Sequence, residues 1–295
     1  MDTTVTLEVV LDAPAARPEA ERAIERGFGW FAAVEAACSR FDPASEVRAL
    51  AARPQQPVEV SPLLWQAVRF ALEVARQSGG AFDPTVGQRM ETLGFVRNHR
   101  TGREEPSGLP ASPGPSWRDV VLDARRRTIL LRRPLLLDLG AVAKGLAVDL
   151  ALRELEGFPG AVVEAGGDLA VRGRNAEGRP WRIGVRHPRE QGALCCVLGL
   201  EDGAVCTSGD YERRAPQGGA SHIVDPRGPS DPCAISCTVV APGAMVADAL
   251  GTAAMVLGPD RALSWLEARG VEALIWTPQL ERRTTAGFSG LEVAP

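Results

Sequence analysis

Residues 135–149 read LLLDLGAVAKGLAVD, an apolar run that contains an aspartate, a row of small residues and a lysine. Lys144 is the only lysine of the chain, and the other 32 basic residues are all arginine. A compact, flexible ammonium group and a planar guanidinium fork are not equivalent at a binding site. The one lysine therefore indicates a site that needs an ammonium group, although a chance lysine at a helix start remains the alternative.

The same stretch predicts a buried strand that turns through Gly140 into a helix over residues 142–155. The first turn of a helix exposes backbone N–H groups and the positive end of the helix dipole, which together favour an anion. Lys144 in that first turn adds positive charge, and Asp138 at the strand end suits a cation or a sugar or ring group. An ordinary strand-to-helix connection explains the pattern equally well.

The rest of the chain alternates less regularly between helices and strands. Apolar spacing and capping residues predict helices over residues 17–38, 62–78, 246–257 and 259–269. Alternating patterns predict strands over residues 3–11, 161–173, 181–188, 193–209, 221–225, 233–241 and 272–278. This order predicts an α+β fold in a single domain over residues 1–295 rather than regular βαβ units. The Pro- and Gly-rich residues 97–117 are typical of a mobile surface loop.

Composition excludes several classes of protein. The formal net charge is −4 over 295 residues and no basic stripe appears, so we expect no nucleic-acid partner. No apolar run reaches the roughly 18 residues that a membrane-spanning helix needs. The first residues read as a strand, without a leader or lipid-anchoring cysteine, so we expect a cytoplasmic protein. An exported protein whose leader lies outside this sequence is the alternative.

The cysteine and histidine patterns argue against a zinc site. The six cysteines contain no CxxC pair, and His99, His187 and His222 are far apart in the sequence. We expect the cysteines to be buried small hydrophobic residues in a reduced compartment.

Two further motifs carry residues suited to chemistry. In VADALGTAAMVLG (246–258), Asp248 and Thr252 stand at i and i+4, so a helix places both oxygens on one face. Such an all-oxygen set suits Mg²⁺, although an aspartate near a helix start and a packed threonine explain it too. After AVCTSGDYER (204–213), which holds the single tyrosine, Tyr211, comes SHIVDPRGP (221–229), where His222 beside Asp225 suits a general base. A structural histidine is the alternative there.

These motifs together resemble the ApbE family, the FAD:protein FMN transferases. The matching stretches run in the family's order: MDTTVTLEV (1–9), SRFDPASE (39–46), GGAFDPTVG (79–87), LDLGAVAKGLAVD (137–149), EAGGDLAVRG (164–173), WRIGVRHP (181–188), TSGDYER (207–213), SHIVDP (221–226) and VADALGTAAMVLG (246–258). The resemblance implies an ApbE-like, T-fold-like architecture in which a mostly antiparallel sheet packs against helices. It also implies Mg²⁺-dependent transfer of FMN from FAD to a Thr or Ser of an acceptor protein, with release of AMP.

The resemblance further implies roles for individual residues. Flavin contacts are implied for Met1, Phe41, Ala81, Phe82, Asp83, Asp138, Lys144 and Ile223. Magnesium ligands are implied in Asp248, Thr252 and the backbone carbonyl of Ala141. We predict that His222 and Asp248 act in catalysis, with His222 as the base that deprotonates the acceptor hydroxyl.

Two other functions stay open. The same site with water in place of the acceptor gives an FAD pyrophosphatase that forms FMN and AMP. A non-catalytic FAD-binding protein is the other possibility. It is favoured by Asp2, where relatives often carry glycine, and by Phe41, where they often carry tyrosine. Retention of Lys144, Asp248 and Thr252 disfavours this last alternative, because a protein that only binds flavin has less need of a metal.

Overall fold

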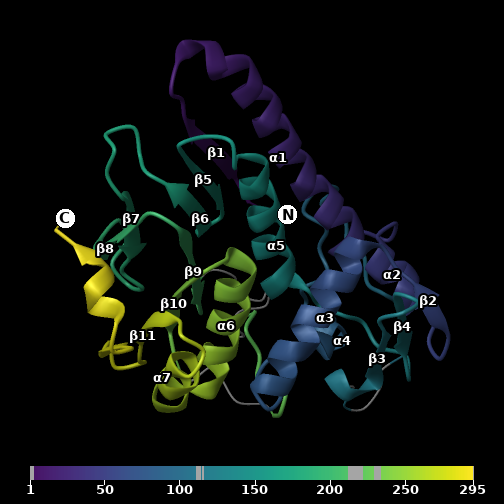
Figure 1. Cartoon of the computed structure of the whole chain (residues 1–295). Helices are drawn as coiled ribbons and strands as arrows, with labels where there is room; N and C mark the ends of the chain where they lie inside the picture. The colour runs from purple at the N-terminus through teal and green to yellow at the C-terminus, as the bar shows by residue number, and fades with distance from the viewer. Residues whose placement is uncertain (1–2, 111–113, 115, 212–221, 229–233, 295) are drawn as a thin grey trace.

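A seven-stranded antiparallel sheet forms the centre of the protein (Figure 1). The computed structural model describes residues 3–110, 114, 116–211, 222–228 and 234–294. The sheet has the strand order β1-β5-β6-β9-β10-β11-β12. Its strands are β1 (Val5–Val10), β5 (Gly160–Ala165), β6 (Asp168–Gly173), β9 (Gly203–Gly209), β10 (Ser236–Ala241), β11 (Glu272–Trp276) and β12 (Arg282–Thr284). Strands that are distant in the sequence, such as β1 and β5 or β6 and β9, are therefore neighbours in the sheet.

Helices cover one face of this sheet. The helix α5 (Gly140–Glu154) packs on β5 and β6, and α6 (Ala244–Leu257) packs on β9 and β10. The long helix α1 (Arg17–Cys38) lies against α5 and also contacts β1 at the edge of the sheet. The helices α3 (Pro62–Gln77) and α7 (Pro259–Glu267) complete the layer, which encloses the larger of the two apolar cores.

The stretch 135–149 fixes how α5 meets α6. A Cβ on Gly145 would lie 2.4 Å from the carbonyl oxygen of Ala244, so only glycine permits this close crossing. Four residues on, the Asp149 carboxylate accepts hydrogen bonds from the backbone N–H groups of Ala244 (2.7 Å) and Met245 (3.0 Å). The start of α6 is thereby capped by a side chain of α5. Asp248, one turn into α6, is thus held at a fixed position relative to Lys144.

Two small sheets flank the main one. One has the order β13-β8-β7, with β7 (Trp181–Arg186), β8 (Leu194–Leu200) and β13 (Glu292–Val293), and shares a second apolar core with the opposite face of the main sheet. The other has the order β2-β4-β3, with β2 (Pro57–Glu59), β3 (Val120–Asp123) and β4 (Thr128–Leu131). The short helices α2 (Glu46–Ala51) and α4 (Gly87–Thr92) lie on the same side as this second small sheet (Figure 1).

Most of the predicted elements are confirmed, including the helices near residues 17–38 and 62–78 and the mostly antiparallel sheet. The strand predicted over 221–225 is wrong in its described part, because residues 222–225 pair with no strand. The helix predicted from 142 begins at Gly140, so Lys144 stands in its second turn and not in its first. Among the described cysteines, Cys195 and Cys196 depart from the prediction because they are only partly buried, and Cys233 lies outside the described residues. No helix in the part of the chain that the structure describes is long and apolar enough to cross a membrane.

Candidate active site

One cavity of about 320 Å³ collects the predicted site residues, and this volume lies within the range of small-molecule sites. Its lining includes every predicted residue that the structure describes: Phe41, Ala81, Phe82, Asp83, Asp138, Ala141, Lys144, His222, Ile223, Asp248 and Thr252. Met1 lies outside the described residues. Motifs that are spread over more than 200 residues of sequence therefore meet at one place, although the role of each residue stays a prediction.

Lys144 contacts two buried carboxylates at one wall of the cavity. Its ammonium nitrogen forms an ion pair with Asp168, whose side chain is 1% exposed, and lies 3.8 Å from Oδ2 of Asp248, whose side chain is 9% exposed. The Lys144 side chain itself is 25% exposed. Because buried charges need partners, the two aspartates hold the ammonium group in place at the cavity wall.

Oxygen donors from α6 and β9 line the same cavity as this ammonium group. The Thr252 hydroxyl lies 3.4 Å from the Ser208 hydroxyl of β9, and both line the cavity together with Ala141 and Asp248. A carboxylate, hydroxyls and a backbone carbonyl are the hard oxygen donors that Mg²⁺ prefers. The donor set therefore fits the magnesium that the resemblance implies. Among the described residues, no group of three or more His, Cys, Asp or Glu side chains offers an alternative metal site.

Asp138, at the turn into α5, accepts hydrogen bonds from other groups of the protein. Its Oδ2 accepts a hydrogen bond from Nε of Arg40 at 2.7 Å, and its Oδ1 accepts one from the N–H of Gly140 at 2.9 Å. Burial alone would raise the pKa of Asp138. The Arg40 charge, these hydrogen bonds and the nearby His222 lower it by more, so the pKa lies below its usual value. The first N–H of α5, that of Gly140, therefore donates to Asp138. Fewer N–H groups at this helix start are then left for the anion that the sequence predicted there.

The residues of GGAFDPTVG form a second wall. The Asp83 carboxylate accepts hydrogen bonds from the N–H (2.9 Å) and hydroxyl (2.7 Å) of Thr85 and from the N–H of Trp117 (3.0 Å). Burial raises the pKa of Asp83, which these hydrogen bonds oppose. Asp83 thus holds the short turn that keeps Phe82 and Ala81 against the cavity, in addition to lining it.

His222 lines the cavity close enough to Asp138 to lower that residue's pKa. The carboxylate of Asp225 accepts hydrogen bonds from the backbone N–H (2.9 Å), Nε (2.8 Å) and Nη2 (2.9 Å) of Arg227. The guanidinium of Arg89, on α4, donates to the backbone carbonyls of Asp225 and Gly228. The described segment 222–228 is thus tied to α4, which fixes the chain beside His222.

Three neighbours of the predicted residues were missed by sequence reasoning. Arg40 and Asp168 lie within motifs quoted above, SRFDPASE and EAGGDLAVRG, but their partners are distant in the sequence. A third is His99, which lines the cavity with Nε2 at 3.2 Å from Oε1 of Glu35. Nothing in the periodicity of the chain signals these pairings.

The sequence pattern of the ApbE family matches residues 1–275. The chain belongs to the ApbE family. It is 32% identical over 225 residues to the FAD:protein FMN transferase of Haemophilus influenzae, which covers 72% of this chain and 65% of that protein. It is 33% identical over 257 residues to the FAD:protein FMN transferase of Treponema pallidum, covering 79% of this chain and 70% of that protein. The chain thus spans about two thirds of the length of these relatives.

Solved structures of ApbE proteins share the fold. The crystal structure of the ApbE protein of Thermotoga maritima superposes with a TM-score of 0.84 at 30% identity, covering 99% of this chain and 96% of that chain. The apo form of the Pseudomonas stutzeri flavinyl transferase ApbE gives a TM-score of 0.79 at 26% identity, covering 99% and 95%. The predicted ApbE-like α+β architecture is therefore confirmed, and the cavity lies within an ApbE fold.

Proposed function

We propose that this ApbE-family protein is an FAD:protein FMN transferase. It transfers the FMN half of FAD to a Thr or Ser hydroxyl of an acceptor protein, releases AMP and depends on Mg²⁺. The relatives from H. influenzae and T. pallidum carry the name FAD:protein FMN transferase. The observation that carries the proposal is the meeting of Lys144, Asp248 and Thr252 at one wall of a cavity that suits a small molecule.

Lys144 is the residue that we expect to contact the diphosphate of FAD. When the bond between the bridging oxygen and the FMN phosphorus breaks, negative charge spreads over the transferred phosphoryl group and the departing AMP. A fixed cation that is already in place stabilises this charge without reorganisation. Since Asp168 and Asp248 both contact its ammonium group, Lys144 is held in one position before substrate arrives.

Asp248, Thr252 and the backbone carbonyl of Ala141 would hold the magnesium ion beside this lysine. When bound, the ion supplies positive charge to the diphosphate oxygens and orients them. Asp248 would then have two tasks, because the carboxylate that would hold the ion also lies 3.8 Å from the Lys144 ammonium group.

His222 is the residue that we assign as general base. It takes the proton from the acceptor hydroxyl oxygen as that oxygen attacks the FMN phosphorus. It lines the same cavity as Lys144, and the described chain that follows it is tied to α4 by Arg89. Phe41, Phe82 and Ile223 offer apolar surface to the flavin ring.

Mass spectrometry of a candidate acceptor domain tests this proposal. The domain is incubated with the protein, FAD and Mg²⁺, and the nucleotides are separated by chromatography in parallel. We expect the acceptor to gain the mass of one FMN, with AMP formed only when acceptor is present. The gain should disappear when the target Thr or Ser of the acceptor is replaced by Val or Ala.

Two variants make the assay specific to the site. Lys144→Ala should lose transfer, whereas Arg17→Ala, which removes an exposed cation on α1, should leave it unchanged. Formation of FMN and AMP without a modified acceptor would replace the proposal by FAD hydrolysis. FAD that stays intact with every acceptor, although it binds, would instead indicate a flavin-binding protein.

A further inference from the structure

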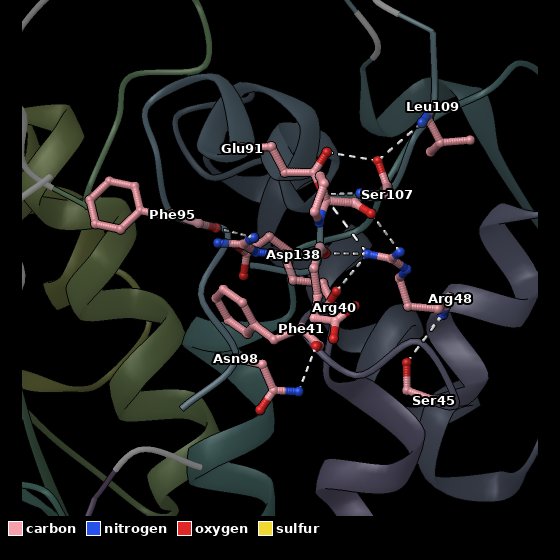
Figure 2. A network of polar contacts seen from close by, with 12 residues as sticks. Arg40, Phe41, Ser45, Arg48, Glu91, Phe95, Asn98, Ser107, Leu109 and Asp138 are labelled. Carbon is pink, nitrogen blue, oxygen red and sulfur yellow. Dashed lines mark hydrogen bonds and ion pairs between the residues drawn. The ribbon is translucent and has the colours of Figure 1, made fainter. Parts of the chain in front are cut away.

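Arg40 is a buried arginine that touches three residues of the cavity wall. Its side chain is 4% exposed. Nε donates to Asp138 at 2.7 Å, Nη1 donates to the carbonyl of Phe95 at 2.7 Å, and the guanidinium lies 3.9 Å from the centre of the Phe41 ring. Figure 2 shows the Asp138 side chain and the backbone carbonyl of Phe95 beside the Arg40 guanidinium, while the Phe95 ring points away from it. Asp138, Phe95 and Phe41 all line the cavity, so one guanidinium contacts three residues of its wall.

The contact with Asp138 bears most directly on ligand binding. The Asp138 side chain keeps 20% of its surface exposed, and this part belongs to the cavity lining. Each carboxylate oxygen has two acceptor sites, and among the described residues the bonds from Arg40 and Gly140 occupy one site on each oxygen. An ionised carboxylate held in this way can accept hydrogen bonds from N–H or O–H groups of a ligand.

The charged groups around Asp138 come from several elements. Arg40 approaches from the loop after α1, and His222 from the described segment 222–228. Lys144, on α5, pairs instead with Asp168 and Asp248. Arg40 is thus the cation that bonds directly to Asp138.

A purely structural role for Arg40 is less consistent with the contacts. The backbone of this region is anchored by a different arginine, Arg48, which donates to the carbonyls of Arg40 (3.1 Å), Glu105 (3.1 Å) and Pro106 (3.0 Å) (Figure 2). Buried ion pairs often contribute little to stability compared with apolar side chains of similar size. A buried pair at the edge of a cavity is better explained by what it does for the cavity.

We propose that Arg40 is a positioning residue, which keeps the Asp138 carboxylate ionised and fixed so that it accepts a hydrogen bond from the bound substrate. The inference rests on the proposed function, because it takes FAD as the substrate. It adds a residue that acts through the Asp138 carboxylate, to which its guanidinium is bonded.

A double-mutant cycle on FAD affinity tests this role. Flavin fluorescence is titrated with the wild-type protein, Arg40→Gln, Asp138→Asn and the Arg40→Gln/Asp138→Asn double variant. We expect Arg40→Gln and Asp138→Asn each to weaken FAD binding by about tenfold or more. A tenfold loss lies within the range of interaction energies that are typical of residues in direct contact. The double variant should bind no more weakly than Asp138→Asn alone, because Arg40 acts through Asp138.

Two controls separate positioning from stability. Arg40→Lys keeps the charge and should recover part of the affinity that Arg40→Gln loses. Arg48→Gln removes an arginine from the same network without touching Asp138, so its effect should add to that of Asp138→Asn (Figure 2). Thermal unfolding of each variant confirms that it is folded. If Arg40→Gln alone is not folded, the comparison of the charge-balanced Arg40→Gln/Asp138→Asn variant with Asp138→Asn still tests whether Arg40 acts through Asp138.

The outcomes are distinct. Additive losses in the Arg40–Asp138 cycle, or equal affinity of Arg40→Lys and Arg40→Gln, would overturn the positioning role while the wild-type protein still binds FAD. If the wild-type protein itself does not bind FAD, the proposed function fails, and the role of Arg40 fails with it.

Discussion

Replacing Lys144 by methionine should destabilise the protein, because it leaves two buried carboxylates without their shared cation. The ammonium group lies 3.8 Å from Asp248, which corresponds to an attraction of about 4 kcal/mol at an effective dielectric constant near 20. Its contact with Asp168, whose side chain is 1% exposed, is closer still. Removal of one partner from a buried pair typically costs about 3–5 kcal/mol. We expect a loss of about 3 kcal/mol, because Lys144 is 25% exposed and water reaches part of the site.

Thermal unfolding in the presence of EDTA measures this loss, since no divalent cation can then replace the missing charge. A destabilisation of about 3 kcal/mol corresponds to a fall in the unfolding midpoint of roughly 5 °C for a protein of this size. The Lys144→Met/Asp168→Asn double variant should recover at least half of the fall, since it removes the charge closest to the missing ammonium group. Arg17→Met is the control, because the pair between Arg17 and Glu21 is exposed and should contribute almost nothing.

Two results would refute the reasoning. One is a Lys144→Met midpoint as close to the wild-type value as that of Arg17→Met. The other is a double variant that is less stable than Lys144→Met, which would mean that Asp168 contributes through packing or other bonds rather than through its charge.

Three further predictions follow from other parts of the structure. The pKa of Cys195 is lowered to about 7, chiefly by its side-chain interaction with the Cys196 thiol, so iodoacetamide should modify Cys195 with a rate that rises through about pH 7, as mass spectrometry of peptides would show. Equal labelling of the buried Cys38, whose pKa burial raises to about 12, would contradict this. Mg²⁺ should raise the unfolding midpoint of the wild-type protein and not that of Asp248→Asn, and an equal rise in both would place the ion elsewhere. Gly145→Ala should lower the midpoint by several degrees, because its Cβ would meet a backbone oxygen at 2.4 Å, whereas Gly157→Ala has no atom within 4 Å to meet; similar midpoints would contradict the close helix crossing.

Local sequence signals determined most of the elements that could be predicted. The helix α3 follows from Ser61 and Pro62, because Ser61 accepts the hydrogen bond of the Leu64 N–H at 3.2 Å as an N-cap should. The helix α2 was missed although Ser45 caps it, since six residues are too few for a periodic pattern. Residues 222–225 alternate like a strand, yet they are assigned to no strand among the described residues, and the backbone carbonyl of Asp225 accepts a hydrogen bond from Arg89. Alternation alone cannot distinguish these two environments.

The cavity lining was predicted better than the contacts that organise it. Asp138 and Lys144 could be singled out because each is unusual in its own stretch of sequence. Their partners could not, since Arg40 is 98 residues from Asp138, and Asp168 reaches Lys144 only because α5 packs on β6. Such pairings depend on the tertiary packing of elements, and no local pattern encodes them. It is therefore easier to predict from the sequence which residues line the cavity than which residues hold those side chains in position.

The charges along the strand-to-helix stretch explain why a divalent cation suits this site. At Asp138 the carboxylate and the Arg40 guanidinium cancel, which leaves a neutral pair with hydrogen-bond acceptors. One helical turn beyond Gly140, about 6 Å along the axis, Lys144 faces two carboxylates, so the group of Lys144, Asp168 and Asp248 carries one net negative charge. A diphosphate would be repelled by that group, whereas a bound Mg²⁺ reverses its sign to one net positive charge. We therefore expect Lys144 alone to be insufficient for binding a diphosphate, and its placement between two aspartates predicts that the metal and the anionic substrate bind interdependently.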